Sequence, residues 1–254
     1  MMEHLVGRRI SSWFGDLLFG VPGNCALCGS VLEPERLSVT EICSPDSVMG
    51  ICPLCLDDLR VSMRSVCAIC GIPMIGSMSL CSDCRSSMGY FDAQRSAGLY
   101  RGNLRRCVRR LKYGGERWLS GPLGRLVAES ARVFLPLDIV VPVPIDPGSL
   151  NQRGFNQARD LAGKVSTCLK VPMEDPLCRA QRREHQAWLG RRDRRGNLRG
   201  TMEVREGVDL TGLRVLVVDD VMTTGATLDE AARALRKVGA VRVYGATVAR
   251  TSLE

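Results

Sequence analysis

Apolar segments of two different periods follow one another in the C-terminal part of the chain. Residues 213–218 (LRVLVV) are a continuous apolar run, as expected for a central strand of a parallel sheet. Residues 227–238 carry apolar positions at helical spacing, namely Leu228, Ala231, Ala232, Leu235 and Val238. Gly239 is placed to end this helix, and residues 241–249 have the pattern of the next strand. The pattern predicts a strand–loop–helix–strand unit.

The same alternation of strand and helix patterns runs from residue 90 to the end and predicts an α/β domain over residues 90–254. Within it, residues 138–143 (DIVVPV) predict a buried strand and residues 156–166 a helix. Residues 1–20 have the pattern of a short amphipathic lead. Residues 21–89 are rich in cysteines and turns, and a module of this size could hardly bury enough core without metal.

Composition and charge narrow the class of protein. Of the 254 residues 45% are hydrophobic, but only 5% are aromatic, so aliphatic side chains must fill the core. No apolar run reaches the roughly 18 residues of a membrane span, and residues 5–19 lack the features of a signal peptide. We therefore expect a soluble, cytoplasmic protein. The net charge of +8 is carried mostly by arginine and indicates an anionic partner, either nucleic acid or a small phosphorylated metabolite.

The cysteines predict structural metal. Nine of the twelve lie between Cys25 and Cys84, and eight of these form C-x2-C pairs: Cys25/Cys28, Cys52/Cys55, Cys67/Cys70 and Cys81/Cys84. In a cytosolic chain this spacing favours zinc over disulfides, and two pairs supply one tetrahedral site. We predict about two structural zinc ions, with the pairs used sequentially. An interleaved arrangement and thioredoxin-like redox pairs are the alternatives, and the role of Cys43 is open.

The loop between the apolar strand and its helix carries the chemistry. Two acids, Asp219 and Asp220, are followed by the small residues Thr223, Thr224, Gly225, Ala226 and Thr227. At the carboxyl end of a parallel strand, such a loop lets backbone N–H groups and a helix N-terminus converge on a phosphate. The acids would repel that phosphate, so hydrogen bonds to sugar hydroxyls suit them better. A dinucleotide site is disfavoured and a Walker loop excluded, because G-x-G-x-x-G and G-K-[ST] are absent.

This segment resembles the phosphoribosyl-pyrophosphate (PRPP) signature of type I phosphoribosyltransferases. The resemblance implies that Asp219 and Asp220 hold the ribose 2′- and 3′-hydroxyls, while residues 223–227 cradle the 5-phosphate. The segment with Pro144, Arg153 and Gly154 resembles the pyrophosphate loop of these enzymes; a proline-rich surface loop is the alternative.

An arginine-rich arm over residues 179–199 resembles the flexible catalytic loop of the same enzymes. Eight arginines lie in it, and the candidate loop residues are Arg182, Arg183, Gln186, Arg191, Arg192 and Asn197. A solvated charged face or a nucleic-acid patch is the alternative. As catalytic cations we favour Lys112 and Arg153 at fixed positions, with Arg191 and Arg192 on the arm.

The combined pattern of cysteine pairs, V-P-V-P, R-G-F-N-Q and D-D-V-M-T-T-G-A-T resembles the ComF (ComFC) family of competence-associated, phosphoribosyltransferase-like proteins over residues 21–250. The resemblance implies a type I phosphoribosyltransferase fold, a mostly parallel sheet flanked by helices, behind a double zinc ribbon. It also implies Mg²⁺-dependent transfer of phosphoribosyl from PRPP, with release of pyrophosphate, to an acceptor such as a nucleobase or an amine. The alternative is a non-catalytic PRPP- or phosphate-sensing module that binds single-stranded DNA or a DNA-uptake helicase.

Overall fold

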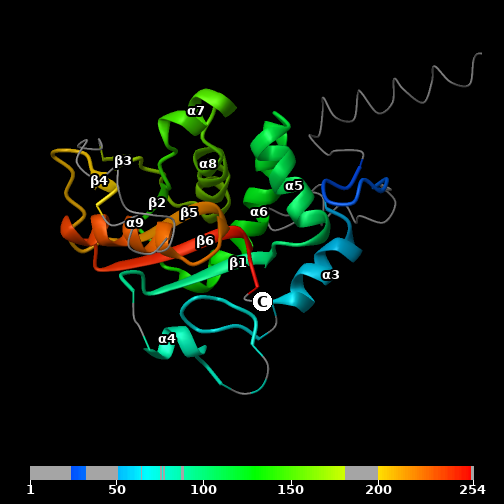
Figure 1. Ribbon diagram of the computed structural model, residues 1–254, viewed down its shortest axis with the longest axis horizontal. Helices are drawn as coiled ribbons and strands as arrows, with labels where there is room; N and C mark the ends of the chain where they lie inside the picture. The colour runs from blue at the N-terminus through cyan, green and yellow to red at the C-terminus, as the bar shows by residue number, and fades with distance from the viewer. Residues whose placement is uncertain are drawn as a thin grey trace, which may run out of the picture.

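A four-stranded parallel sheet forms the centre of the molecule (Figure 1). The computed structural model describes residues 24–32, 51–63, 65–74, 76, 78–86, 89–180 and 200–252. The strands are β1 (Ala93–Leu99), β2 (Ile139–Pro142), β5 (Arg214–Met222) and β6 (Arg242–Arg250), in the spatial order β1-β6-β5-β2. Because all strands are parallel, their carboxyl ends meet at one edge of the sheet, where open α/β sheets bind ligands.

Helices cover both faces of this sheet (Figure 1). On one face lie α5 (Gly102–Tyr113), α6 (Ser120–Ala131) and α8 (Gln157–Leu169), packed around Leu216 and Val218 of β5. On the other lies α9 (Ala226–Lys237), packed on Val215 and Val217. These four β5 residues are fully buried, which explains why the strand is apolar without alternation.

Shorter elements complete the described fold. The helices are α3 (Pro53–Ser62), α4 (Ser82–Ser86) and α7 (Pro147–Arg153), with 3-10 turns at Arg117–Leu119 and Arg132–Phe134. A separate two-stranded antiparallel sheet consists of β3 (Leu177–Arg179) and β4 (Met202–Val204). Within the described part of the chain, no helix is both long and apolar enough to cross a membrane.

The elements predicted from periodicity are present, with one boundary corrected. The helices predicted over residues 156–166 and 227–238 are α8 and α9, and Gly239, with a φ of 97°, follows α9 directly. The strand predicted over residues 213–218 is longer than expected, because β6 offers partners as far as Arg250 and β5 pairs with it up to Met222. Asp219 and Asp220 therefore belong to the strand, and the loop begins only after Met222.

The cysteine module packs onto the sheet domain at two places. Around the first cluster, the thiol of Cys107 on α5 donates a hydrogen bond to the carbonyl of Ala26 at 3.0 Å. Around the second, Met222 at the end of β5 shares a small hydrophobic core with Cys67, Cys70 and Ile72. The carboxyl end of β5 and the second cysteine cluster are thus one packing unit. Residues 1–20, Cys43 and residues 181–199 of the predicted arm lie outside the described residues. Arg179, the first residue of the predicted arm, belongs to β3, because it pairs with Met202 of β4.

Candidate functional site

The two acids of β5 point to opposite faces of the sheet, because successive side chains of a strand alternate. Asp220 is buried, with 7% of its surface exposed, on the face covered by α5. There its carboxylate forms an ion pair with the ammonium group of Lys112 at 2.8 Å. Lys112 lies in the last turn of α5, more than a hundred residues earlier, so the fold brings the predicted cation to the predicted acid.

Asp219 is partly buried on the other face. Burial and the neighbouring Asp220 carboxylate raise the pKa of Asp219 to about 7, well above the ordinary range of an aspartate. A carboxyl group of this kind changes charge near neutral pH, and a cation or a hydroxyl donor bound beside it would favour the ionised form. Perturbed acids of this type are concentrated at functional sites.

The loop after β5 has the geometry of an anion cradle. Gly225 has a φ of 84° and caps the N-terminus of α9. The N–H groups of the first helical turn have no partners within the helix; that of Ala226 lies 3.4 Å from the hydroxyl of Thr224. A side chain at Gly225 would approach the methyl carbon of Met222 to 2.7 Å, and its backbone conformation also favours glycine. Thr223 and Thr224 are exposed, as ligand contact requires.

The loop after β2 ends in a pair of side chains with unused donors. Arg153 is the last residue of α7, and Gly154, with a φ of 74°, turns the chain toward α8. One terminal nitrogen of Arg153 donates to the amide oxygen of Gln157 at 3.2 Å, and the other donates to the hydroxyl of Tyr113 at 3.4 Å. The Nε of Arg153 and the Nε2 of Gln157 are buried without a partner. Buried donors of this kind are rare in proteins, so each is expected to have an acceptor from an ordered water molecule or a ligand.

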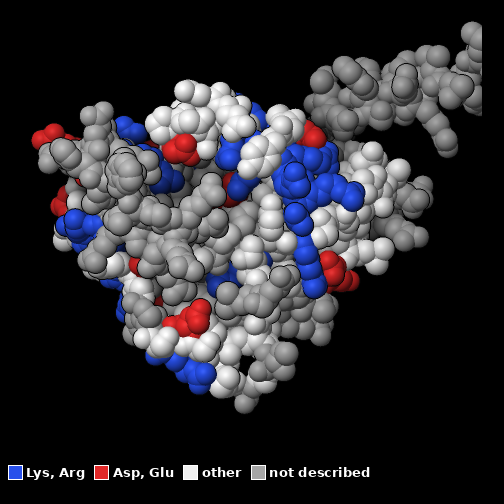
Figure 2. All heavy atoms as spheres, viewed as in Figure 1, with Lys and Arg blue, Asp and Glu red and all other residues white. Residues whose placement is uncertain are grey.

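A continuous set of contacts joins these two loops. Asp220 contacts Lys112, the next residue Tyr113 lies under the guanidinium of Arg153 at 5.0 Å, and Arg153 contacts Gln157. On the far side, the Nε of Arg179 donates to the carbonyl of Pro144 at 2.9 Å. Figure 2 shows the surface hollowed between α5 and α7, with basic side chains beside the hollow. The sheet edge thus combines two acids, an anion cradle and several cations.

The eight paired cysteines form two four-thiol clusters in the sequential arrangement. The first is Cys25, Cys28, Cys52 and Cys55, and the second is Cys67, Cys70, Cys81 and Cys84. Within each cluster the ligand atoms lie within 4.8 Å of one another, and the Sγ atoms of Cys28 and Cys52, like those of Cys70 and Cys81, are 3.7 Å apart. A tetrahedral zinc ion with bonds of about 2.3 Å places its sulfur ligands about 3.8 Å apart. Both clusters therefore fit a four-coordinate metal ion.

Comparison with known proteins identifies the family. Residues 153–252 match the phosphoribosyl transferase domain family. Over 239 residues the chain is 30% identical to the DNA utilization protein YhgH of Salmonella typhi, an alignment that covers 91% of this chain and 98% of that one. It is 28% identical to competence protein F of Haemophilus influenzae, over 76% of this chain and 95% of the relative. Competence protein ComFC of Bacillus subtilis is 27% identical, over 85% of this chain and 89% of the relative.

The chain belongs to the ComF/ComFC family. The parallel sheet with helices on both faces, preceded by two cysteine clusters, is accordingly a type I phosphoribosyltransferase fold with an N-terminal zinc-ribbon-like module.

In this ComF-family chain, the predicted site residues divide into two groups. Those that the structure brings to the sheet edge are Lys112, Pro144, Arg153, Gly154, Asp219, Asp220 and residues 223–227. Those on the arm, namely Arg182, Arg183, Gln186, Arg191, Arg192 and Asn197, lie outside the described residues.

Three further residues of the site were missed by sequence reasoning. Gln157 is part of the R-G-F-N-Q motif, but the sequence analysis assigned it no function. Arg179 was predicted only as the first residue of the arginine-rich arm, and Tyr113 only as the neighbour of Lys112. The fold places them against Pro144 and Arg153.

Proposed function

We propose that the chain binds PRPP at the carboxyl edge of the sheet and transfers its phosphoribosyl group to an acceptor, with release of pyrophosphate. The observation that carries the proposal is the chain of contacts from Asp220 through Lys112 and Tyr113 to Arg153. PRPP has a ribose 5-phosphate at one end and a pyrophosphate at the other, so it needs two anion sites joined by a sugar site. The loops after β5 and β2 provide such a pair.

Each group has a role that its position supports. The N-terminus of α9 and the small residues 223–227 would hold the 5-phosphate, while Asp219 and Asp220 would accept hydrogen bonds from the ribose hydroxyls. The unpartnered donors of Arg153 and Gln157 would reach the pyrophosphate oxygens, and Lys112 would exchange its ion pair with Asp220 for a contact to the ligand. Magnesium bound with PRPP would supply additional positive charge at the leaving group.

The chemistry needs no protein nucleophile. Pyrophosphate leaves C1 of the ribose as the acceptor attacks, and negative charge grows on the leaving oxygen. Fixed cations that already face this oxygen stabilise that charge without reorganising, and such stabilisation accounts for much of the rate enhancement of many enzymes. Arg153 is the described cation that we assign to this position, and Lys112 would join it after exchanging its ion pair with Asp220. Arg191 and Arg192 of the arm are the candidates that would complete the set.

The cysteine clusters are assigned a structural role. Four thiolates fill all the positions of a tetrahedral zinc ion, whereas catalytic zinc keeps one position open for water or substrate. We propose one zinc ion in each cluster. Their function is to stabilise a module that is too small to bury a sufficient core by itself.

Calorimetry with PRPP and Mg²⁺ tests the binding site. Wild-type protein is expected to bind, while Asp219→Asn and Asp220→Asn each weaken binding at least tenfold. Asp209→Asn is the matched control, because Asp209 is an exposed aspartate just before β5, at the opposite edge of the sheet. Binding that survives both site substitutions would refute the assignment. Pyrophosphate release from PRPP in the presence of candidate acceptors then tests the reaction itself.

A second candidate function, binding of single-stranded DNA, is favoured by one surface. Arg105, Arg106, Arg109 and Arg110 of α5 line an open groove of about 530 Å³ that ends at Tyr113. Figure 2 shows basic side chains gathered over α5. Guanidinium groups on a groove with an aromatic ring suit a nucleic-acid backbone and its bases.

Fluorescence anisotropy with labelled single-stranded oligonucleotides separates the two candidates. If this groove binds DNA, the triple substitution of Arg105, Arg106 and Arg109 to Ala lowers both the affinity and the salt dependence of binding while leaving PRPP binding intact. If PRPP binds but no acceptor releases pyrophosphate, the non-catalytic alternative is favoured.

A further inference from the structure

The two cysteine clusters differ in what they contact. The first lies in the large core that α5 and α6 bury against the sheet, where Cys107 donates a hydrogen bond to the carbonyl of Ala26 at 3.0 Å. The second has a small core of its own, and Met222 is one of its buried members. Met222 ends β5 and directly precedes residues 223–227, here called the phosphate loop. The second cluster is therefore packed against the root of this loop.

Hydrogen bonds to the backbone of the second cluster fix its position on the sheet. The carbonyl of Ile69 accepts from the backbone N–H of Gln94 at 2.7 Å. The carbonyl of Cys70 accepts from the guanidinium of Arg250 at 2.6 Å and from the side-chain amide of Gln94 at 2.8 Å. Both donor residues are buried, one on β1 and the other on β6. The metal-binding turn thus has a defined position relative to the two strands.

The phosphate loop rests on the core of the second cluster. A Cβ atom on Gly225, the residue that caps α9, would lie 2.7 Å from the methyl carbon of Met222 and 3.6 Å from the ring of Phe91. Met222 is only 4% exposed, and Phe91 packs against the same core. Side chains that belong to this core therefore support the loop whose backbone N–H groups would bind a phosphate.

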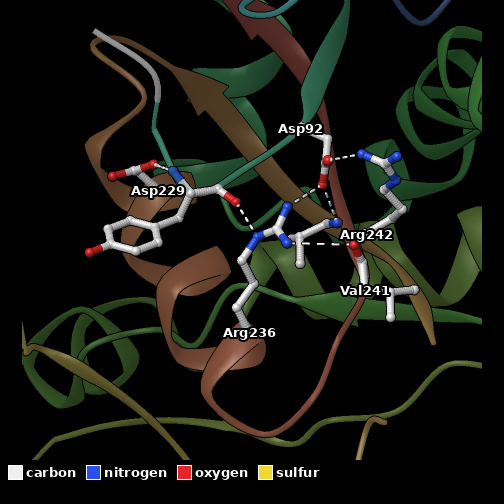
Figure 3. Close-up of polar contacts among 7 residues, drawn as sticks. Asp92, Asp229, Arg236, Val241 and Arg242 are labelled. Atoms are coloured by element: carbon white, nitrogen blue, oxygen red, sulfur yellow. Dashed lines mark hydrogen bonds and ion pairs between the residues drawn. The ribbon is translucent and has the colours of Figure 1, made fainter. Parts of the chain in front are cut away.

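The segment that follows the second cluster is also fastened to α9, the helix that begins at the phosphate loop (Figure 3). The backbone N–H of Tyr90 donates to the carboxylate of Asp229 in the first turn of α9. The carbonyl of Tyr90 accepts from the Nε of Arg236 at 2.6 Å, and Asp92 forms an ion pair with the same arginine at 2.6 Å. These contacts lie on both sides of Phe91 in the chain, so a shift of Phe91 would also displace α9.

A metal ion in the second cluster would hold this support together. Its ligands come from two separate turns, one with Cys67 and Cys70 and the other with Cys81 and Cys84, and the ion would join the turns through four bonds. The core described around them has four buried residues, of which two are ligands. A core of this size is too small to hold the turns without the ion. Loss of the ion would therefore loosen the side chains beneath the phosphate loop.

We propose that the metal ion of the second cluster sets the affinity of the phosphate loop, and that Met222 and Phe91 are the positioning residues through which it acts. The proposal rests on the proposed function, because it concerns the loop that we assign to the 5-phosphate of PRPP. The ion of the first cluster has no such effect, since its cluster packs against α5. Coupling between two sites is reciprocal, so a phosphate bound in the loop strengthens zinc binding in the second cluster by the same factor.

Equilibrium competition with a chromogenic zinc chelator tests this coupling in the full-length protein, with ribose 5-phosphate as the probe of the phosphate loop. Two variants each keep one complete cluster: Cys55→Ser keeps the second, and Cys84→Ser keeps the first. Saturating ribose 5-phosphate is expected to raise the zinc affinity of Cys55→Ser about fivefold or more and to change that of Cys84→Ser by less than about twofold. In calorimetry, Cys84→Ser is expected to bind ribose 5-phosphate about fivefold more weakly than Cys55→Ser.

A substitution that spares all the ligands tests the route. In the Cys55→Ser background, Met222→Ala is expected to reduce the effect of ribose 5-phosphate on zinc affinity to less than about twofold, with the zinc still bound. Met173→Ala, at a partly buried methionine beside β2, is the matched control and is expected to keep the full effect. If Met222→Ala does not fold, Phe91→Leu takes its place and is expected to halve the effect.

Three results would overturn the proposal. In the first, ribose 5-phosphate binds Cys55→Ser and leaves its zinc affinity unchanged. In the second, it raises the zinc affinity of both cysteine variants equally, which indicates general stabilisation of the fold. In the third, the full effect survives in Met222→Ala or in the Phe91→Leu protein that replaces it. These results leave the phosphate site standing, whereas failure of the zinc-loaded wild type to bind either ribose 5-phosphate or PRPP would refute the proposed function and this coupling together.

Discussion

The ion pair between Lys112 and Asp220 gives a quantitative test of how the sheet edge is assembled. The two side chains are 18% and 10% exposed, and their charged atoms are 2.8 Å apart. Removing one partner of a fully buried pair costs about 3–5 kcal/mol, whereas an exposed pair contributes about 0–1 kcal/mol. Their exposure places this pair between the two limits. We expect Lys112→Met to lower the free energy of unfolding by about 2–3 kcal/mol, because it leaves the Asp220 carboxylate without its cation.

The matching substitutions isolate the pair itself. Asp220→Asn is expected to cost less, about 1 kcal/mol, because the Lys112 ammonium lies nearer to water and can be hydrated there. The double variant has neither the cation nor the buried carboxylate, so it avoids the cost of an unpaired charge, and we expect a coupling energy of about 1–2 kcal/mol. Urea unfolding of the four proteins, followed by circular dichroism at constant zinc, measures this coupling. Lys237→Met, at an exposed lysine of α9, is the control for losing a lysine anywhere.

Additive effects of the two substitutions on the free energy of unfolding would refute this reasoning. If the two single effects sum to that of the double variant within about 0.5 kcal/mol, the side chains are not coupled and α5 is not fastened to β5 by this contact. The same outcome would weaken the proposal that PRPP displaces Asp220 from Lys112, because an absent pair has nothing to exchange.

Three further predictions concern the same edge and the metal clusters. Because the pKa of Asp219 is raised in the folded protein to about 7, against about 3.9 when unfolded, the native state holds the extra proton and stability falls as pH rises between these values. Asp219→Asn should therefore be more stable than the wild type at pH 8 and no different below pH 4 in urea titrations without ligand. Gly225→Ala should lower stability by about 1–2 kcal/mol, from its φ of 84° and the contact with Met222, and should weaken PRPP binding in calorimetry; unchanged values would contradict the described loop. Elemental analysis should find about two zinc ions per chain and about one in Cys84→Ser, whereas an unchanged zinc content would contradict the four-thiol assignment.

The sequence correctly predicted those elements whose structure depends on residues close together in the chain. The apolar run of β5 and the helical spacing of α9 predicted both elements, and the cysteine spacing predicted the four-thiol groups that the fold assembles. The predicted end of β5 was wrong. The length of a strand depends on its partner, and β6 pairs with β5 beyond Asp219.

Residues that act through distant contacts gave no usable signal. Arg250 resembles any strand-end arginine until its partner, the carbonyl of Cys70, is known to lie 180 positions earlier. Phe91 is an isolated aromatic in the sequence, and only its packing against the core that contains Met222 assigns it a place. Gln157 was visible in a motif, but its unused amide donor depends on burial, which spacing cannot report.

The contact between Met222 and the second cysteine cluster has a consequence for biosynthesis. A ribosome makes Cys67 and Cys70 long before it makes Met222, and the carbonyl of Cys70 receives its hydrogen bond from Arg250, near the end of the chain. The first cysteine cluster instead contacts α5, whose Cys107 lies 81 residues after Ala26, compared with the 180 residues that separate Cys70 from Arg250. We therefore expect the two halves of the amino-terminal module to reach their final packing at different times on the emerging chain. We expect its second half to remain accessible to chaperones, proteases and oxidants until β6 has been synthesised.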